Sequence, residues 1–147
     1  MNACNIDETT KQHVLSEIKR IGYSKALKGI RPITIEGKIV SDADMCDAMG
    51  AHGLLRCYAY SMKIKQPFFD RNLFPIENIS QETYTTYDST SVNHLFEKIL
   101  KLKDYMLTNE GKIESLKRHQ IIVDFLKQFF YEENANEWLE YLENHSL

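Results

Sequence analysis

The sequence has little of what marks several common classes of protein. It holds only three cysteines, Cys4, Cys46 and Cys57, an odd number without metal-type spacing, so neither a disulfide framework nor a zinc site is indicated. No apolar run approaches the ~20 residues that a membrane span requires. The N-terminus does not show the basic and then apolar pattern of a secretory signal. These absences predict a protein with reduced thiols that is located in the cytoplasm.

The chain also lacks an excess of positive charge. It has 18 Lys and Arg residues against 21 Asp and Glu residues, which gives a net charge of −3. No overall basic field can therefore attract nucleic acid or an anionic membrane. We expect neither as a partner, and any binding of phosphate must be local.

What the chain does have is the composition of a globular domain. Its 147 residues suit a single domain that spans residues 1–147, and 43% are hydrophobic while 27% are charged. Apolar residues recur at helical spacing along most of the chain. The sequence therefore predicts an all-α single domain of about four or five helices. We expect these helices over residues 7–21, 35–62, 92–107, 112–132 and 135–142, with Thr34 as the N-cap of the second and Ser91 as the N-cap of the third.

Two parts of this prediction concern packing. The first expected helix carries an apolar stripe of Val14, Leu15, Ile18 and Ile21, which we expect to face the core. Residues 64–90 form a long segment that is rich in proline, asparagine and aromatic residues. This segment has two interpretations, a lid over a pocket or an excursion whose aromatic side chains fill the core, and we favour the second.

The most unusual stretch places Asp42, Asp44 and Asp47 within six residues in a background of small and apolar residues. Buried carboxylates are costly unless they are paired or bound to a cation. Successive residues of a helix turn by about 100°, so Asp44 and Asp47 share a face while Asp42 points away. Either all three carboxylates are solvated or cap neighbouring backbone, or Asp44 and Asp47 meet one ion. Gly50 and Gly53 weaken a helix, which predicts the close approach of another helix near Asp44.

The order of residues in this stretch resembles a known family. The pattern Asp42-Ala43-Asp44-x-x-Asp47-Ala48-x-Gly50-Ala51-x-Gly53, followed by Arg56, is similar to the end of the catalytic core in the HD-domain superfamily of metal-dependent phosphohydrolases. The similarity continues through Asn93-His94-x-x-Glu97-Lys98 and Thr108-x-x-Gly111-Lys112, and it covers about residues 12–133. It resembles the C-terminal part of the small bacterial-type branch that hydrolyses nucleotides.

The resemblance implies the hydrolysis of a phosphate ester or anhydride, in a nucleotide or another phosphorylated small molecule. It also implies a divalent metal ion such as Mn, Co, Ni, Mg or Fe. The family's metal ligands are a His, a His-Asp pair and a final Asp. Asp44 matches this last aspartate and is therefore the candidate metal ligand. Asp47 is expected to be an auxiliary carboxylate of the site. Arg56 and Lys98 are the candidate phosphate contacts.

The other three ligands of that set have no counterpart in this sequence, because none of its five histidines is followed by Asp. Ile21 also stands where related sequences carry a polar, ionisable residue. Three interpretations remain open: the C-terminal part of a longer or split enzyme, a degenerate member, or a chain whose partner supplies the ligands. Enzyme activity of this chain alone is therefore left uncertain. The alternative function is a catalytically inactive helical interaction module derived from the HD fold, which would form a homo-oligomer or bind a partner chain through an exposed apolar patch.

Overall fold

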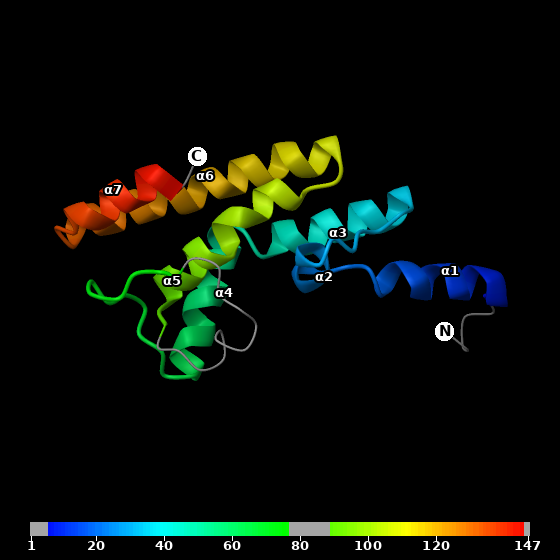
Figure 1. The fold of residues 1–147 in the computed structure, drawn as a ribbon, viewed down its shortest axis with the longest axis horizontal. Helices are drawn as coiled ribbons and strands as arrows, with labels where there is room; N and C mark the ends of the chain where they lie inside the picture. The colour runs from blue at the N-terminus through cyan, green and yellow to red at the C-terminus, as the bar shows by residue number, and fades with distance from the viewer. Residues whose placement is uncertain (1–5, 77–88, 146–147) are drawn as a thin grey trace.

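A computed structural model describes residues 6–76 and 89–145 of the chain, and regular structure within these ranges is entirely helical. The all-α fold class is therefore confirmed. The described elements are seven α-helices and one 3-10 helix, more than the expected four or five (Figure 1). Two of the expected helices are interrupted, and one short helix, at residues 23–27, was not expected. The elements are α1 (Glu8–Ile18), α2 (Tyr23–Leu27), α3 (Ile35–Asp47), α4 (Gly50–Lys63), α5 (Ser91–Glu97), the 3-10 helix η2 (Ile99–Tyr105), α6 (Asn109–Glu132) and α7 (Asn136–His145).

The expected helix over residues 35–62 begins as predicted but is broken in the middle. Thr34 is its N-cap, and the Thr34 hydroxyl accepts a hydrogen bond from the Gly37 amide at 3.1 Å. The helix ends at Asp47, and Gly50 then takes a φ of +70°, a conformation that favours glycine. A side chain at Gly53 would overlap the Ala48 carbonyl inside the bend. These glycines therefore make the corner between α3 and α4, and only Gly50 also lies against a neighbouring helix, next to Arg118 of α6.

The expected helix over residues 92–107 is likewise divided. Thr90, rather than Ser91, is the N-cap, and its hydroxyl accepts a hydrogen bond from the Asn93 amide at 3.0 Å. The α-helix ends at Lys98, whose backbone leaves the helical region with φ −133° and ψ −59°. The chain then continues as η2, so that Lys98 lies at the junction of the two elements.

The core lies where α5, η2, α6 and α7 meet, and aromatic side chains fill one end of it. α7 turns back along α6, and Phe130 and Trp138 from these two helices are fully buried (Figure 1). Phe69 lies edge-on to Trp138 with ring centroids 5.1 Å apart, and Phe74 stacks on Trp138 at 4.3 Å. Phe68 and Phe69 of the 64–90 segment pack against the core, as the core-filling interpretation expects, whereas Phe74 is 38% exposed. Tyr84 and Tyr87 lie outside the described residues.

The prediction that the apolar stripe of α1 faces a core is wrong. No residue of α1 is buried, and Val14 and Ile18 are exposed. α1 lies at one end of the molecule (Figure 1), where Glu17 accepts hydrogen bonds from the Ile33 and Thr34 amides at 2.9 and 3.1 Å.

Within the described ranges, no helix combines the length and the apolar character needed to cross a membrane.

Candidate functional site

The candidate site is a cavity of about 1110 Å³ between α3, α4, α5, the start of η2 and the segment over residues 64–73. All four residues expected from the sequence line it: Asp44, Asp47, Arg56 and Lys98. The bend between α3 and α4 is what brings Arg56 back beside α3. The cavity therefore joins acidic and basic side chains from three separate parts of the chain.

Asp44 lies on the face of α3 that lines the cavity, and its residue is exposed. None of the hydrogen bonds or ion pairs found between described residues involves its carboxylate. An exposed carboxylate of this kind is available to a ligand. It is not, by itself, a metal site, because metal affinity depends on the number and geometry of the ligands.

Asp47, unlike Asp44, is paired with another side chain of the cavity, Arg56. The Arg56 guanidinium donates from Nη1 to the Asp47 carboxylate and from Nη2 to the Asp47 carbonyl oxygen, both at 2.6 Å. The hydrogen bond from Arg56 lowers the pKa of Asp47, and the charge of Arg56 lowers it further. Because arginine has five donors, Arg56 keeps further N–H groups for an anion while it holds Asp47.

Lys98 enters the cavity beside Tyr23, with its Nζ atom 5.5 Å from the centroid of the tyrosine ring. His94, one helical turn earlier on α5, lines the same cavity. Burial lowers the pKa of His94 to about 4, and the Lys98 ammonium contributes to the same shift. His94 is therefore neutral at pH 7. Sequence reasoning gave His94 no role, although its spacing of four from Lys98 was a signal that both residues face one side of a helix.

Asp42 is the aspartate that the sequence sets apart from the other two, and the structure shows its role. Its residue is only 3% exposed, and its carboxylate accepts hydrogen bonds from the Leu107 amide at 2.8 Å, the Thr108 amide at 2.8 Å and the Thr108 hydroxyl at 2.7 Å. Asp42 is therefore not solvated, but it binds backbone amides, so the expectation that these carboxylates are solvated or cap backbone holds for Asp42 in its capping form. The carboxylate lies at the N-terminus of α6, where a negative charge is favourable.

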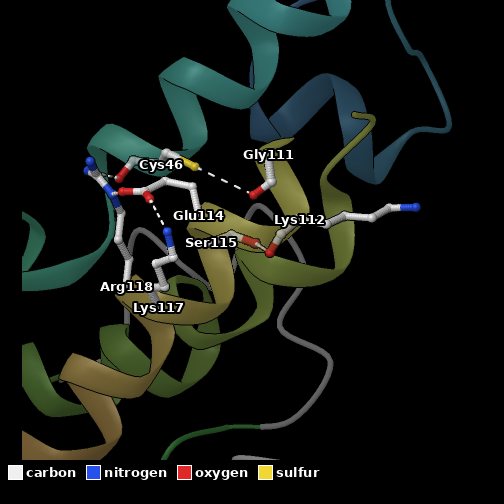
Figure 2. A network of polar contacts seen from close by, with 7 residues as sticks. All are labelled: Cys46, Gly111, Lys112, Glu114, Ser115, Lys117 and Arg118. Atoms are coloured by element: carbon white, nitrogen blue, oxygen red, sulfur yellow. Dashed lines mark hydrogen bonds and ion pairs between the residues drawn. The ribbon is translucent and has the colours of Figure 1, made fainter. Parts of the chain in front are cut away.

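A second set of contacts holds the C-terminal end of α3 against α6 (Figure 2). Arg118 donates from Nη1 to the Cys46 carbonyl oxygen at 2.9 Å and from Nε to the Glu114 carboxylate at 2.7 Å. The Cys46 thiol lies 4.0 Å from the Gly111 carbonyl oxygen. Together with Asp42, these contacts fix which face of α3 meets α6. They thereby leave the Asp44 face toward the cavity.

The described residues do not provide a complete metal centre. Across residues 6–76 and 89–145 there is no group of three or more His, Cys, Asp or Glu side chains that could hold an ion. The donor set around Asp44 therefore does not fit the divalent metal that the sequence resemblance implies.

The fold is HD-like. A crystal structure of an HD-superfamily hydrolase from Bacillus thuringiensis is 34% identical to this chain, covers 91% of it and has a TM-score of 0.68. A crystal structure of a protein from Lactobacillus plantarum is 31% identical over the same 91% share, with a TM-score of 0.77. No family model matches the sequence.

The similarity extends to a curated protein and to its solved structures. The uncharacterized protein YpgQ of Bacillus subtilis is 28% identical over 116 residues, which cover 79% of this chain. A crystal structure of YpgQ in complex with ADP is 23% identical with a TM-score of 0.64, a likeness of fold. The chain spans 48% of YpgQ, 63% of the Lactobacillus plantarum structure and 58% of the Bacillus thuringiensis structure. It therefore matches about half to three fifths of each relative.

Proposed function

We propose that this chain carries the phosphate-binding part of an HD-type phosphohydrolase site that acts on a nucleotide or another phosphorylated small molecule. One observation carries the proposal: Asp44, Arg56 and Lys98 line one cavity in a chain whose fold is HD-like. The specific branch, the substrate and the metal dependence belong to this proposal.

The charges of the cavity suit a phosphate group. Lys98 is a partly buried ammonium beside Tyr23, and a phosphate near it would interact more strongly than in bulk water because the local dielectric constant is lower. Arg56 lies on another wall and is held in place by Asp47. A phosphate that reached both cations would be oriented from two sides.

Binding of ADP to the chain tests this proposal, since a relative of the same fold has been solved with ADP. We expect isothermal titration calorimetry to detect ADP binding, and we expect Lys98→Ala to weaken it about 10-fold because one charge-assisted contact, worth about 1.4 kcal/mol, is lost. Lys101→Ala is the matched control, because Lys101 is exposed three residues further along and does not line the cavity. If Lys98→Ala binds ADP as tightly as the unmodified chain does, the cavity is not the phosphate site.

A further inference from the structure

The wall that α4 contributes to the cavity carries polar side chains that the proposed function does not use. Ser61 lines the cavity and is only 3% exposed, and its hydroxyl oxygen lies 2.6 Å from that of Ser91, the first residue of α5. Cys57, one helical turn before Ser61, donates a weak hydrogen bond from its thiol to the Ser91 carbonyl oxygen at 3.7 Å. Two contacts between α4 and α5 therefore fix the position of the Ser61 hydroxyl.

The Ser61 hydroxyl keeps hydrogen-bonding capacity for a ligand. A serine hydroxyl has one proton to donate and two lone pairs that accept. Ser91 is fully buried and donates its proton to the Ser61 oxygen, which uses one of the two lone pairs of Ser61. The Ser61 proton is donated to no other described residue, and a buried donor without an acceptor is unfavourable. Ser61 therefore presents one proton and one lone pair to the cavity, which match a hydroxyl group that both accepts and donates.

Apolar side chains lie on the same side of α4 as Ser61. Tyr60 and Ile64 both line the cavity, and they are 62% and 49% exposed. Residues three and four apart share one side of a helix, so Ile64 lies next to both Ser61 and Tyr60. An exposed aromatic ring of this kind offers a surface on which a nucleic-acid base can stack. The α4 wall thus combines a stacking surface with a hydroxyl group that is available to a ligand.

The volume of the cavity leaves room for more than a phosphate group. It is about 1110 Å³, and pockets of about 300–1,000 Å³ already hold drug-sized ligands. A phosphate bound at Arg56 and Lys98 would fill only a small part of this space. The rest of the ligand would then lie against the other walls, among them the α4 wall of Tyr60, Ser61 and Ile64.

We propose that the α4 wall binds the nucleoside part of a nucleotide whose phosphates lie at Arg56 and Lys98. The base stacks on the Tyr60 ring with Ile64 beside it, and Ser61 forms a hydrogen bond with a hydroxyl group of the sugar. This inference rests on the proposed function for the position of the phosphates. It goes beyond that function by selecting nucleotides over other phosphorylated small molecules and by assigning the residues that recognise them.

The test compares the binding of ADP and of pyrophosphate, which lacks the nucleoside, by isothermal titration calorimetry. The unmodified chain should bind ADP at least about 10-fold more tightly than pyrophosphate, because stacking of the base adds to the affinity. Ser61→Ala should weaken ADP binding about 10-fold through the loss of one hydrogen bond, and Tyr60→Ala should weaken it about 10-fold through the loss of stacking. Neither variant should change the affinity for pyrophosphate. Ser91→Ala is the matched control, because it breaks the same hydrogen bond between the two serines but leaves the Ser61 hydroxyl in place; it should bind ADP as tightly as the unmodified chain.

Several outcomes would overturn the inference. It is wrong if the unmodified chain binds ADP no more tightly than pyrophosphate, a comparison that needs no variant to fold. It is also wrong if Ser61→Ala leaves ADP binding unchanged, or if Ser61→Ala and Ser91→Ala weaken it equally, because Ser61 then acts only in the structure of the chain. Pyrophosphate binding that Lys98→Ala weakens would still support the proposed function in each of these cases. If neither ligand binds, both the inference and the proposed function are wrong.

Discussion

Replacement of Asp42 by alanine should destabilise the chain far more than the same replacement at Asp44. The Asp42 carboxylate accepts three hydrogen bonds of 2.7–2.8 Å and is almost completely buried, whereas Asp44 is exposed. The Asp42→Ala variant leaves the Leu107 and Thr108 amides without an acceptor at the start of α6. Each of these two amides, left without an acceptor, costs about 1–3 kcal/mol. We expect a total of about 3 kcal/mol.

Urea denaturation followed by circular dichroism measures this difference. With an m-value of about 2 kcal/mol/M, the midpoint for Asp42→Ala should fall by about 1.5 M. Asp44→Ala should change the free energy of unfolding by less than about 0.5 kcal/mol, as is usual for exposed sites. Equal losses of stability in the two variants would refute the assignment of Asp42 as the link between α3 and α6. So would a loss for Asp42→Ala below about 0.5 kcal/mol.

Two further predictions concern stability. In Gly111→Ala, the new methyl group would overlap the Asp42 carboxylate, so the free energy of unfolding should fall by about 2 kcal/mol. This penalty should nearly vanish in the Asp42→Ala background. Additive losses of stability in urea melts would argue against direct contact between residue 111 and Asp42. The pKa of His94 is lowered from 6.5 to about 4. Between these values the unfolded state binds more protons, so stability should fall by up to about 3 kcal/mol as the pH drops from 6.5 to 4. Melts at a series of pH values should show a weaker pH dependence of stability in His94→Gln. His13→Gln is the control, because His13 is exposed, and it should keep the pH dependence of the unmodified chain. Equal pH profiles for the two variants would contradict the burial of His94.

The sequence was most informative where a local pattern determines a local structure. Helical periodicity predicted the all-α class, and Thr34 was recognisable as an N-cap because a hydroxyl before an apolar run suits that position. The helical angle between aspartates correctly separated Asp42 from Asp44 and Asp47. The expectation that aromatic residues of the 64–90 segment pack into the core holds for Phe68 and Phe69 but not for Phe74, which is exposed.

Sequence reasoning failed where the decisive partner is distant along the chain. Asp42 binds the backbone at residues 107 and 108, and no periodicity in α3 contains that information. The pairing of Asp47 with Arg56 depends on the bend at Gly50, where one helix was expected to continue. The apolar residues of α1 do have helical spacing, but no other described element packs over them. A pattern shows which face is apolar, not what covers it.

The roles of the candidate site residues remain predictions. The structure places Asp44, Asp47, Arg56 and Lys98 around one cavity, which is compatible with a phosphate site, but it tests neither phosphate contact nor metal binding. The expected homo-oligomer and the partner chain also stay predictions.

The most direct test of this account is the affinity of the chain for ADP, measured by isothermal titration calorimetry. The unmodified chain is compared with the double variant Arg56→Ala and Lys98→Ala, and with Lys101→Ala, which alters an exposed lysine outside the cavity. The account predicts that the unmodified chain and Lys101→Ala bind ADP equally and that the double variant binds about 100-fold more weakly, because two charge-assisted contacts are lost. Equal affinities for the double variant and the unmodified chain would contradict it.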